Sequence, residues 1–413
     1  MKILVIGGGG REHALAWKLA QSPGVEVFAA PGNPGIAKVG TCLAASPLEA
    51  ATSVGADLTV VGPEAPLVSG IADEFRSRGL KIIGPGAAAA RLEGSKIFAK
   101  HFLLQRHIPT ARFVAAETRD EALRTLHSFG FPVVLKADGL AAGKGVVIAR
   151  DRDEAEAALA TLRGRLLIEE FLDGEEVSFI ALCDGKTAVP LAATQDHKAA
   201  YDDDRGPNTG GMGAYSDSTI LTEAEAREIL DRVIYPTVDA TGFTGFLYAG
   251  LMMTASGPKV LEFNVRLGDP ETQPLMHRMA ADLAQVLLAA AHGELERVKL
   301  AWREGPSVCV VLASGGYPDA YETGKPIYGI HAAEATGAVV FHAGTRQGAT
   351  ELETAGGRVL GVTASGPDLS IAIKNAYHGV RAIHFEGLHY RTDIGRKGLR
   401  RYNERTRARS SDG

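Results

Sequence analysis

The sequence predicts an α/β protein, in which a parallel α/β N-terminal domain is followed by smaller α+β units. Two features of the chain support this fold class. Between residues 2 and 100, apolar runs alternate with helical stretches, and continuous apolar strands of this kind form parallel sheets that helices cover on both faces. Beyond residue 100 the strands become shorter, and glycine-rich turns separate several of them.

Composition and charge indicate a globular protein of several domains that does not bind nucleic acid. A chain of 413 residues with 45% hydrophobic and 23% charged residues is typical of a globular protein of roughly two to four domains. Its 49 glycines exceed the usual share of about 7%, which indicates tight backbone approach to ligands. The formal charge of −5, with no basic run before the Arg-rich last twenty residues, argues against a nucleic-acid partner. We expect that Arg-rich tail to be solvated.

Cysteine usage and hydropathy bear on the location of the protein. Cys42, Cys183 and Cys309 are scattered and odd in number, so they indicate neither a disulfide framework nor a zinc site. The first residues begin a strand and are too short for a signal peptide, and no apolar run reaches 18 residues. We therefore expect a cytoplasmic protein without a membrane partner, and we expect a monomer.

The first predicted domain spans residues 1–100. Its strands are predicted at Lys2–Ile6, Val25–Ala29, Leu58–Val61 and Leu80–Ile83, with a helix at Arg11–Gln21. Loops rich in Gly and Pro follow these strands, at the carboxyl edge where open α/β sheets bind ligands.

The first of these loops, Gly7-Gly-Gly-Gly10, invites comparison with a dinucleotide fingerprint. That interpretation fails because Glu12 stands at the third glycine position and because the next strand ends in Ala29-Ala-Pro31, without an acid to hold a ribose. Backbone N–H groups at the start of the following helix can instead bind a phosphate, with a merely tight turn as the alternative. The residues assigned to a phosphate-bearing substrate are Gly8, Gly9 and Gly10.

A helix beginning at Ser95 leads into the second predicted domain, residues 101–190, a small α+β unit. Its strands are predicted at Val133–Lys136, Gly145–Ala149, Leu166–Glu169 and Glu176–Leu182, with a helix between the second and the third that places Ala155, Ala158, Leu159 and Leu162 on one face.

A glycine-rich turn follows the strand that ends at Lys136. It is not a Walker A motif, because three residues instead of four separate Gly139 from Gly143 and because Gly145 replaces the Ser or Thr that would hold Mg²⁺. A glycine-rich hairpin with an ordinary surface Lys144 is one interpretation; a loop that covers phosphates is the other.

The third and fourth predicted domains span residues 191–305 and 306–413. In the third, Thr222-x-x-Glu225 forms a capping box that starts a helix. The polar stretch Glu296–Gly305 marks the boundary. Beyond it, strands are predicted at Ser307–Ala313, Val339–Phe341 and Val359–Thr363, with a helix at Leu369–Ile383.

The most informative segment is Val260–Gln273. In its predicted strand, Glu262, Asn264 and Arg266 alternate with Leu261, Phe263, Val265 and Leu267, so the three polar side chains share one face and the four apolar ones lie in a core. A carboxylate and an amide oxygen on a rigid strand suit a hard divalent cation, and an arginine beside them can neutralise a phosphoryl group. A solvated edge strand is the alternative for these three residues alone, but the Gly-Asp-Pro turn that follows favours a functional site.

The segment resembles the metal-binding strand of the ATP-grasp ligases. Its end, Arg266-Leu-Gly-Asp-Pro-Glu-Thr-Gln273, resembles the signature of the glycinamide ribonucleotide synthetase family, and the resemblance runs along nearly the whole chain. It implies a two-lobed ATP-grasp core, with residues 101–190 as the small lobe or lid and residues 191–305 as the large lobe. ATP would lie between the lobes, and lid closure would exclude water from the reaction.

The same resemblance assigns a nucleotide site. Lys96 and Lys136 would contact the phosphates of ATP, and Glu176 would bind the ribose. The glycine turn would close over the phosphates through Gly139, Gly143, Lys144 and Gly145. The adenine would be lined by Glu169, Glu170, Phe171 and Leu172.

The resemblance also assigns the metal and the reacting groups. Glu262 and Asn264 would bind Mg²⁺ or Mn²⁺, and Arg266 and Asp269 would be catalytic. Many ATP-grasp enzymes carry another acid about a dozen residues earlier, but Tyr248–Met253 contains none. Water or phosphate must then complete the coordination of the metal, and this absence agrees with the glycinamide branch of the family.

The implied substrates are glycine and 5-phosphoribosylamine. The glycine carboxylate would attack the γ-phosphorus of ATP to give glycyl phosphate and ADP, and the amine would then displace phosphate to give 5′-phosphoribosylglycinamide, a step of purine biosynthesis. Besides the N-terminal glycines, the residues assigned to the substrates are Asp196, Lys198, Asn208, Thr209, Gly210, Arg266, Asp269, Pro270 and Glu271.

Several of these residues fall in the stretch from Gln195 to Gly213, which we predict to be a long polar loop beside the substrate site. His197 within it is predicted to order the loop and not to act as a general base.

Two other functions remain open from the sequence. One is another ATP-grasp ligase of purine synthesis that uses formate or bicarbonate, against which Leu267-Gly-Asp-Pro-Glu271 argues. The other is a nucleotide-sensing binding protein without catalysis, against which the intact set Glu262, Asn264 and Arg266 argues.

Overall fold

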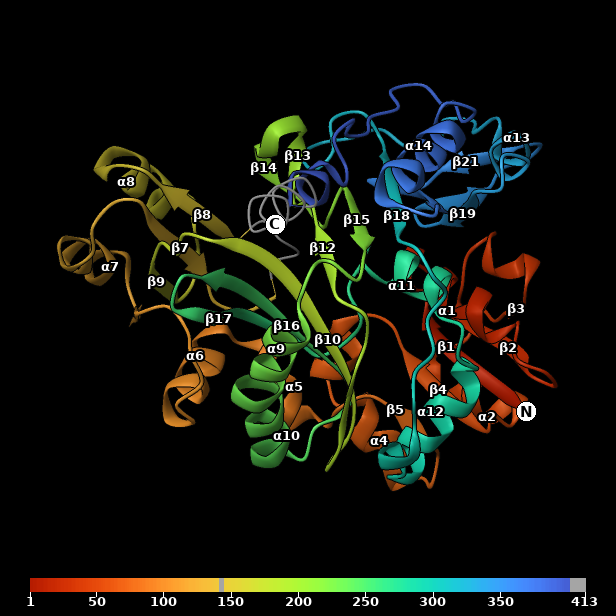
Figure 1. The fold of residues 1–413 in the computed structure, drawn as a ribbon, viewed down its shortest axis with the longest axis horizontal. Helices are drawn as coiled ribbons and strands as arrows, with labels where there is room; N and C mark the ends of the chain where they lie inside the picture. Colours follow the sequence, from red (N-terminus) through yellow and green to blue (C-terminus); the bar gives the residue numbers. More distant parts are fainter. Residues whose placement is uncertain (141–144, 402–413) are drawn as a thin grey trace, which may run out of the picture.

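A computed structural model describes residues 1–140 and 145–401 of the chain. Its N-terminal part is a five-stranded parallel sheet in the order β3-β2-β1-β4-β5 (Figure 1). The strands are β1 Lys2–Gly7, β2 Glu26–Pro31, β3 Thr41–Cys42, β4 Leu58–Val61 and β5 Ile82–Ile83. The helices are α1 Gly10–Leu19, α2 Pro47–Val54, α3 Glu64–Val68, α4 Ile71–Ser77 and α5 Ala87–Gly94.

This sheet confirms the predicted parallel α/β domain. The apolar runs that predicted β1 and β4 are almost wholly buried, as expected for strands covered on both faces. The short strand β3 and the helices α2 to α5 were not predicted, because each is shorter than the window of roughly 11–18 residues over which apolar periodicity is recognised.

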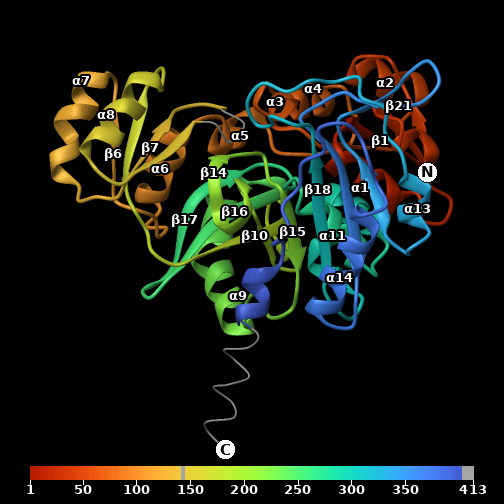
Figure 2. The same ribbon diagram turned by 90° about the horizontal axis from the view of Figure 1, so that it is seen from above.

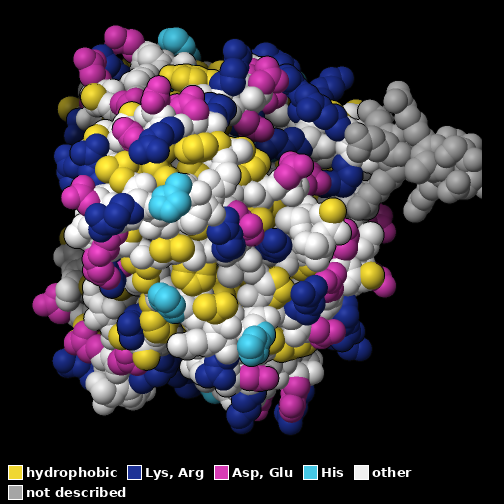
Figure 3. All heavy atoms as spheres, turned by 90° about the vertical axis from the view of Figure 1, so that its left-hand side faces the viewer, with side chains coloured by type: hydrophobic (Ala, Val, Ile, Leu, Met, Phe, Trp, Pro, Cys, Tyr) yellow, Lys and Arg dark blue, Asp and Glu magenta, His cyan; other side chains and the backbone are white. Residues whose placement is uncertain are grey.

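The region predicted as the lid, residues 101–190, contains a four-stranded sheet in the order β6-β9-β7-β8, whereas the strands within its residues 175–190 belong to the larger sheet described below. The four-stranded sheet and the helices beside it are called the lid from here on. Its elements are α6 Lys96–Gln105, β6 Phe113–Ala116, α7 Arg119–Thr125, β7 Val133–Ala137, β8 Val146–Ala149, α8 Arg152–Thr161 and β9 Leu166–Glu170. The lid has a hydrophobic core of its own, in which Leu126, Leu135 and Leu159 are buried. It lies at one end of the molecule (Figures 1 and 2), and on its outer face charged side chains separate the apolar ones (Figure 3).

The large lobe and the C-terminal part share one nine-stranded sheet, in the order β17-β16-β10-β12-β15-β18-β22-β19, with β11 paired to β10. Its strands are β10 Glu175–Asp184, β11 Ala188–Pro190, β12 Thr194–Asp196, β15 Gly213–Ser216, β16 Thr244–Thr254, β17 Gly257–Asn264, β18 Ser307–Ala313, β19 Val339–His342 and β22 Arg358–Ser365. Because β15 pairs with β18, the sheet runs through the predicted boundary at residues 305/306 without a break. The division into four domains stays a prediction.

Helices and two small hairpins complete this part. The helices are α9 Glu223–Ile229, α10 Tyr235–Thr241, α11 Thr272–Arg278, α12 Leu283–His292, α13 Ile330–Glu334 and α14 Leu369–Val380. The predicted capping box of α9 is confirmed: the Thr222 hydroxyl accepts from the Glu225 N–H at 3.2 Å, and the Glu225 carboxylate accepts from the Thr222 N–H at 2.7 Å. The hairpins are β13 Ala199–Tyr201 with β14 Arg205–Asn208, and β20 Thr345–Gln347 with β21 Leu352–Thr354.

Two local predictions are wrong. The stretch from Gln195 to Gly213 is not a loop: it contains the hairpin β13–β14 between strands β12 and β15. Leu261 does not point into the core but lines a cavity, because a bulge pairs Leu251 with Val260 and Gly250 with Glu262, which leaves Leu261 as the extra residue.

Within the described residues, no helix combines the length and the apolar character that crossing a membrane requires.

Candidate active site

A cavity of about 490 Å³ opens between the lid and the large lobe. All four parts of the chain contribute to it: Arg11 from the N-terminal sheet domain, Lys136 from the lid, Glu262 from the large lobe and Arg358 from the C-terminal part. The predicted site residues that line it are Lys96, Lys136, Gly139, Gly145, Glu169, Glu170, Phe171, Leu172, Glu176, Asp196, Lys198, Asn208, Thr209, Gly210, Glu262, Asn264, Arg266, Asp269 and Glu271. Residues from Lys96 to Glu271 thus converge on one place.

The lid wall of the cavity contains a buried cluster of one acid and two lysines. Glu169, which is 1% exposed, lies 2.9 Å from the ammonium of Lys100 and 3.0 Å from that of Lys136. Burial lowers the pKa of Lys100 to about 8, although Glu169 opposes the shift. The cluster fixes Lys136 at the end of β7, where the sequence predicted a contact to phosphate.

Lys96 lies at the first position of α6, next to the glycine turn. Ser95 caps the helix by accepting from the Phe98 N–H, and the ammonium of Lys96 donates to the carbonyl of Gly139 at 2.7 Å. Burial lowers the pKa of Lys96, with Glu262 opposing the shift and Lys136 adding to it. The predicted turn residues Gly143 and Lys144 lie outside the described residues.

The segment predicted to line adenine, Glu169 to Leu172, begins in the last two residues of β9 and continues beyond it. Glu170 accepts from the Arg112 N–H at 2.9 Å and lies 3.5 Å from the ammonium of Lys259. Phe171 is 40% exposed, while Leu172 is buried. The carboxylate of Glu169 is held by lysines, so the backbone and the apolar side chains of this segment are the groups left for a base.

The two residues predicted to bind a cation, Glu262 and Asn264, carry side-chain oxygens near the end of β17. The side chain of Glu262 is 34% exposed and makes an ion pair of 3.7 Å with Lys198, and Asn264 offers its side-chain oxygen, which accepts from Arg266 at 3.0 Å. Burial raises the pKa of Glu262, but Lys198, Lys136, Lys96 and Arg266 outweigh it and hold that pKa below its ordinary value, so the carboxylate is ionised. An ionised carboxylate and an amide oxygen on a cavity wall fit a hard cation that keeps most of its coordination for phosphate and water.

Arg266 follows β17 instead of continuing it, since the strand ends at Asn264. Its guanidinium lies 3.0 Å from Glu93 and 3.4 Å from Glu64, two acids of the N-terminal part. These carboxylates fix the arginine in the cavity wall, with its charge directed to the same space as Lys96 and Lys136.

The turn Gly268–Glu271 brings two further acidic groups to the cavity, those of Asp269 and Glu271. Asp269 lies 3.3 Å from Arg358 of β22, and this arginine with Arg11 keeps the pKa of Asp269 low in spite of burial. Glu271 is buried, where it accepts from the Tyr248 hydroxyl at 2.8 Å and from Ser178 at 3.1 Å. Pro270, predicted as a substrate residue, does not line the cavity but packs beside Gly211.

Asp196 and Lys198 flank His197 at the end of β12. Burial and the nearby Glu271 raise the pKa of Asp196 well above its ordinary value, whereas Glu176, 3.4 Å from the ammonium of Lys198, raises the pKa of that lysine. Lys198 therefore stays charged between Glu176 and Glu262, the acids predicted to bind ribose and metal.

Comparison with known proteins places this arrangement in a family. Three family models match the chain in succession: the phosphoribosylglycinamide synthetase N domain over residues 1–93, its ATP-grasp (A) domain over residues 94–272 and its C domain over residues 307–397. The chain belongs to the phosphoribosylglycinamide synthetase family. The predicted fold class and the predicted relationship to ATP-grasp ligases are thereby confirmed.

Individual members of the phosphoribosylglycinamide synthetase family match almost end to end. The phosphoribosylamine–glycine ligases of Pseudomonas aeruginosa and of Escherichia coli strain K12 are each 50% identical, over 97% of this chain and 99% of their own. The crystal structure of phosphoribosylamine–glycine ligase from Thermotoga maritima superimposes with a TM-score of 0.84 at 35% identity, covering 95% of this chain and 100% of that one.

The N-terminal glycine loop lies beside the cavity, not in its wall. The N–H of Gly9 donates to the carboxylate of Glu12 at 2.6 Å, and a side chain at Gly9 or Gly10 would come within 3.7 Å of Asp269. Gly8 sits directly against the carbonyl of Gly32, so a larger residue would not fit there. The loop is thus placed next to the Asp269 turn, and its assignment to a substrate phosphate stays a prediction.

Some residues of the site were not predicted from the sequence. They are Arg11, Glu64, Glu93, Lys100, Tyr248, Tyr317 and Arg358. A signal existed only for Lys100, one turn beyond Lys96 on a predicted helix. The others reach the cavity through long-range contacts: Arg11 donates to the carbonyl of Leu267, and Arg358 donates to the carbonyls of Gly210 and Asp269.

Proposed function

We propose that this protein ligates glycine to 5-phosphoribosylamine with ATP as co-substrate, through glycyl phosphate, as in the family to which it belongs. The observation that carries the proposal is the convergence on one cavity of Lys96 and Lys136, of Glu262 and Asn264, and of Arg266 beside the Asp269 turn. Cations for a triphosphate, oxygens for a metal and, in the same cavity, the carboxyl groups of Asp196 and Glu271 are parts that such a ligase can use.

In the first step, the glycine carboxylate attacks the γ-phosphorus of ATP, the bond to the β-phosphate oxygen breaks and ADP leaves. Lys96, Lys136 and Arg266 offset the negative charge that the two reactants bring together. Mg²⁺ or Mn²⁺ fits the oxygens of Glu262 and Asn264, and when bound it would supply further neutralisation of phosphate charge. The residues themselves contribute position and charge and no covalent chemistry.

We place the ammonium group of glycine beside Asp196 and Glu271. Both carboxyl groups line the cavity, and Tyr248 and Ser178 orient Glu271. The high pKa of Asp196 arises partly from its proximity to Glu271, and a bound ammonium would relieve that repulsion. Charge complementarity therefore favours glycine over formate or bicarbonate, which carry no cationic group.

In the second step, the amine of 5-phosphoribosylamine attacks the carbonyl carbon of glycyl phosphate, the acyl–oxygen bond breaks and phosphate leaves, while the amine nitrogen loses a proton. The substrate phosphate is assigned to Gly8–Gly10 at the start of α1, and Asp269, next to this loop, is assigned to orienting the amine. Asn208, Thr209 and Gly210 line the same side of the cavity.

The proposed function is tested by measuring ADP release and the transfer of ¹⁸O from glycine to phosphate in the same reaction. ADP release should require glycine and 5-phosphoribosylamine for continued turnover, and ¹⁸O placed in the glycine carboxylate should enter the released phosphate, one atom per product. Product formation without label in phosphate would refute the acyl-phosphate route. Absence of ADP release with both substrates would refute the function itself, as expected of a nucleotide-binding protein without catalysis. The metal, the monomeric state and the cytoplasmic location stay predictions.

A further inference from the structure

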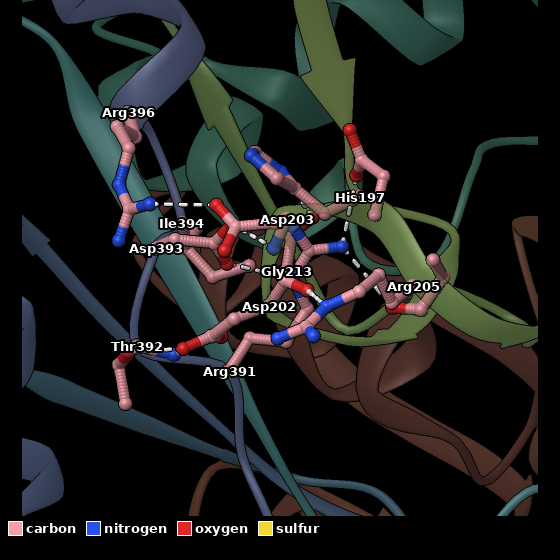
Figure 4. Close-up of polar contacts among 12 residues, drawn as sticks. His197, Asp202, Asp203, Arg205, Gly213, Arg391, Thr392, Asp393, Ile394 and Arg396 are labelled. Atoms are coloured by element: carbon pink, nitrogen blue, oxygen red, sulfur yellow. Dashed lines mark hydrogen bonds and ion pairs between the residues drawn. The ribbon is translucent and has the colours of Figure 1, made fainter.

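The chain after α14 does not stay beside the strands of the C-terminal part but contacts the large lobe. Residues 389–401, here called the C-terminal strap, lie along the hairpin β13–β14 and place Arg391, Thr392 and Asp393 against the aspartates at the hairpin tip (Figure 4). Within the Arg-rich last twenty residues, the expectation of a solvated tail is wrong for Arg401, which is buried against Glu175, and Arg396 and Lys397 form ion pairs with the hairpin. Residues 402–413 of that tail lie outside the described residues.

The hairpin tip is Asp202-Asp-Asp204, and the strap contacts each of its residues. The Thr392 N–H donates to Asp202 at 2.8 Å, the Asp203 N–H donates to Asp393 at 3.0 Å, and the ammonium of Lys397 lies 2.8 Å from Asp204. Asp203 and Asp204 have φ of 59° and 54°, a conformation that residues with a side chain keep only where their surroundings hold it.

Arg391 is the central residue of the strap. It is 1% exposed, and its guanidinium donates twice to Asp393, at 2.7 and 2.8 Å, to Asp204 at 3.0 Å and to the carbonyl of Ala199 at 3.1 Å. A planar fork of donors that joins two carboxylates and a backbone carbonyl fixes both their distance and their orientation.

The foot of the hairpin carries predicted substrate residues. Ala199, which Arg391 holds, follows Lys198 directly, and the carbonyl of Lys198 accepts from both the N–H and the hydroxyl of Thr209, at 2.8 and 2.9 Å. On the large-lobe wall, the ammonium of Lys198 reaches Glu176 and Glu262. The strands β13 and β14 form a sheet of only two strands, so the strap supplies support that no neighbouring strand of the described sheets gives.

We propose that Arg391 is a positioning residue of the active site: through the hairpin β13–β14 it sets the place of Lys198 and of Asn208, Thr209 and Gly210 at the cavity. The inference rests on the proposed function for its kinetic readout. It makes the C-terminal strap part of the catalytic machinery, although none of its described residues lines the cavity.

The variant Arg391→Met, in the full chain, keeps the length of the side chain and removes the fork. We expect kcat/KM for 5-phosphoribosylamine to fall by about tenfold to a hundredfold, the effect of misplacing a site by about 1 Å. Hydrogen exchange of the amides of residues 199–209 should rise. Arg278→Met is the matched control, because Arg278 is also buried and donates to Ser216 instead of to the hairpin. At temperatures where Arg278→Met is folded, its kcat/KM for 5-phosphoribosylamine and its hydrogen exchange at residues 199–209 should stay near the wild-type values. Arg391→Lys should give values between those of the wild type and Arg391→Met.

The outcomes separate the two proposals. If wild type releases no ADP with both substrates, the proposed function fails, while hairpin exchange still tests the strap. If wild type turns over and folded Arg391→Met keeps kcat/KM within twofold, or shows unchanged exchange at residues 199–209, the positioning role is overturned. Should Arg391→Met not fold, the double variant Thr392→Val, Arg396→Gln removes two exposed side-chain contacts of the strap: the hydrogen bond from the Thr392 hydroxyl to Asp202 and the ion pair of Arg396 with Asp203. This double variant must raise both the hydrogen exchange of residues 199–209 and the KM for 5-phosphoribosylamine. If either quantity stays at its wild-type value, the inference is overturned.

Discussion

Two acidic residues on opposite walls of the cavity, Glu169 and Glu262, are held in different ways. On the lid wall, Glu169 is almost wholly buried and lies within 3.0 Å of two lysines, so its charge is neutralised inside the protein. On the large-lobe wall, Glu262 has a side chain that is 34% exposed, and its ion pair with Lys198 spans 3.7 Å. The first arrangement holds Lys136 and makes each buried charge depend on its partner, whereas the second leaves carboxylate oxygens at the cavity.

The strongest test of this contrast is Glu169→Gln. It leaves Lys100 and Lys136 buried beside each other without a counter-charge, and removing one partner of a buried ion pair typically costs about 3–5 kcal/mol in the free energy of unfolding. Urea denaturation should show a loss of this size. Glu176→Gln, whose side chain is 49% exposed in its pair with Lys198, should cost at most about 1 kcal/mol. Equal losses in both variants would contradict the division of roles.

For Glu262 and Asn264 on the large-lobe wall we expect a large effect on catalysis and a small effect on the free energy of unfolding. Glu262→Gln or Asn264→Ala should lower kcat by about 10²–10³, the usual cost of removing a group that stabilises charge in the transition state. The free energy of unfolding should change little, because both side chains face the cavity. Steady-state assays at saturating Mg²⁺ test this, with Glu353→Gln, outside the cavity, as the control. Wild-type kcat in either variant would remove the metal assignment.

The contrast extends to the N-terminal glycine loop, which is predicted to serve the amine and not ATP. In Gly9→Val, the new side chain would meet the carboxylate of Glu12 at 2.7 Å and disturb the start of α1. The KM for 5-phosphoribosylamine should rise by about tenfold, equivalent to about 1.4 kcal/mol, with the KM for ATP nearly unchanged. Gly130→Val, where nothing lies within 4 Å, is the control. A variant that lost ATP affinity instead would show that the loop serves the nucleotide.

The lid and strand β17 show which parts of the fold can be predicted from neighbouring residues in the sequence. β7, β8, β9 and β17 were predicted to within a few residues, because apolar alternation and glycine turns are properties of neighbouring residues. The grouping of Lys96, Lys136 and Glu262 at one cavity came from the family resemblance, and the structure brings these residues together. The ion pairs of Glu169 could not be predicted, since they depend on the relative placement of α6, β7 and β9.

The stretch from Gln195 to Gly213 shows where local signals fail. Its Asp, Gly, Pro and Asn residues are typical of a loop, and three of its aspartates would be unstable neighbours in isolation. They form a hairpin tip because Arg391, Arg396 and Lys397 arrive from nearly two hundred residues further along the chain. Contacts of such sequence separation leave no periodic pattern that a single sequence displays.

His197 offers the last and smallest test, on the buried side of the large-lobe wall. Burial, with Lys397 and Arg391 adding to it, lowers its pKa from 6.5 to about 3, and its Nε2 accepts from the Gly395 N–H at 3.3 Å. Between these two pH values the unfolded chain binds a proton that the folded protein does not, so the stability of the wild type must fall as the pH drops below about 6.5.

The variant His197→Gln keeps a polar side chain but cannot take up this proton. Relative to the wild type, its free energy of unfolding should therefore gain about 1.4 kcal/mol for each pH unit below about 6.5. Urea denaturation between about pH 7 and pH 5 measures this difference, and His331→Gln, whose ring is exposed, controls for the loss of a histidine. A pH-independent difference would mean that the ring has the same pKa in the folded and the unfolded protein, and the neutral, buried state of His197 behind Asp196 and Lys198 would be excluded.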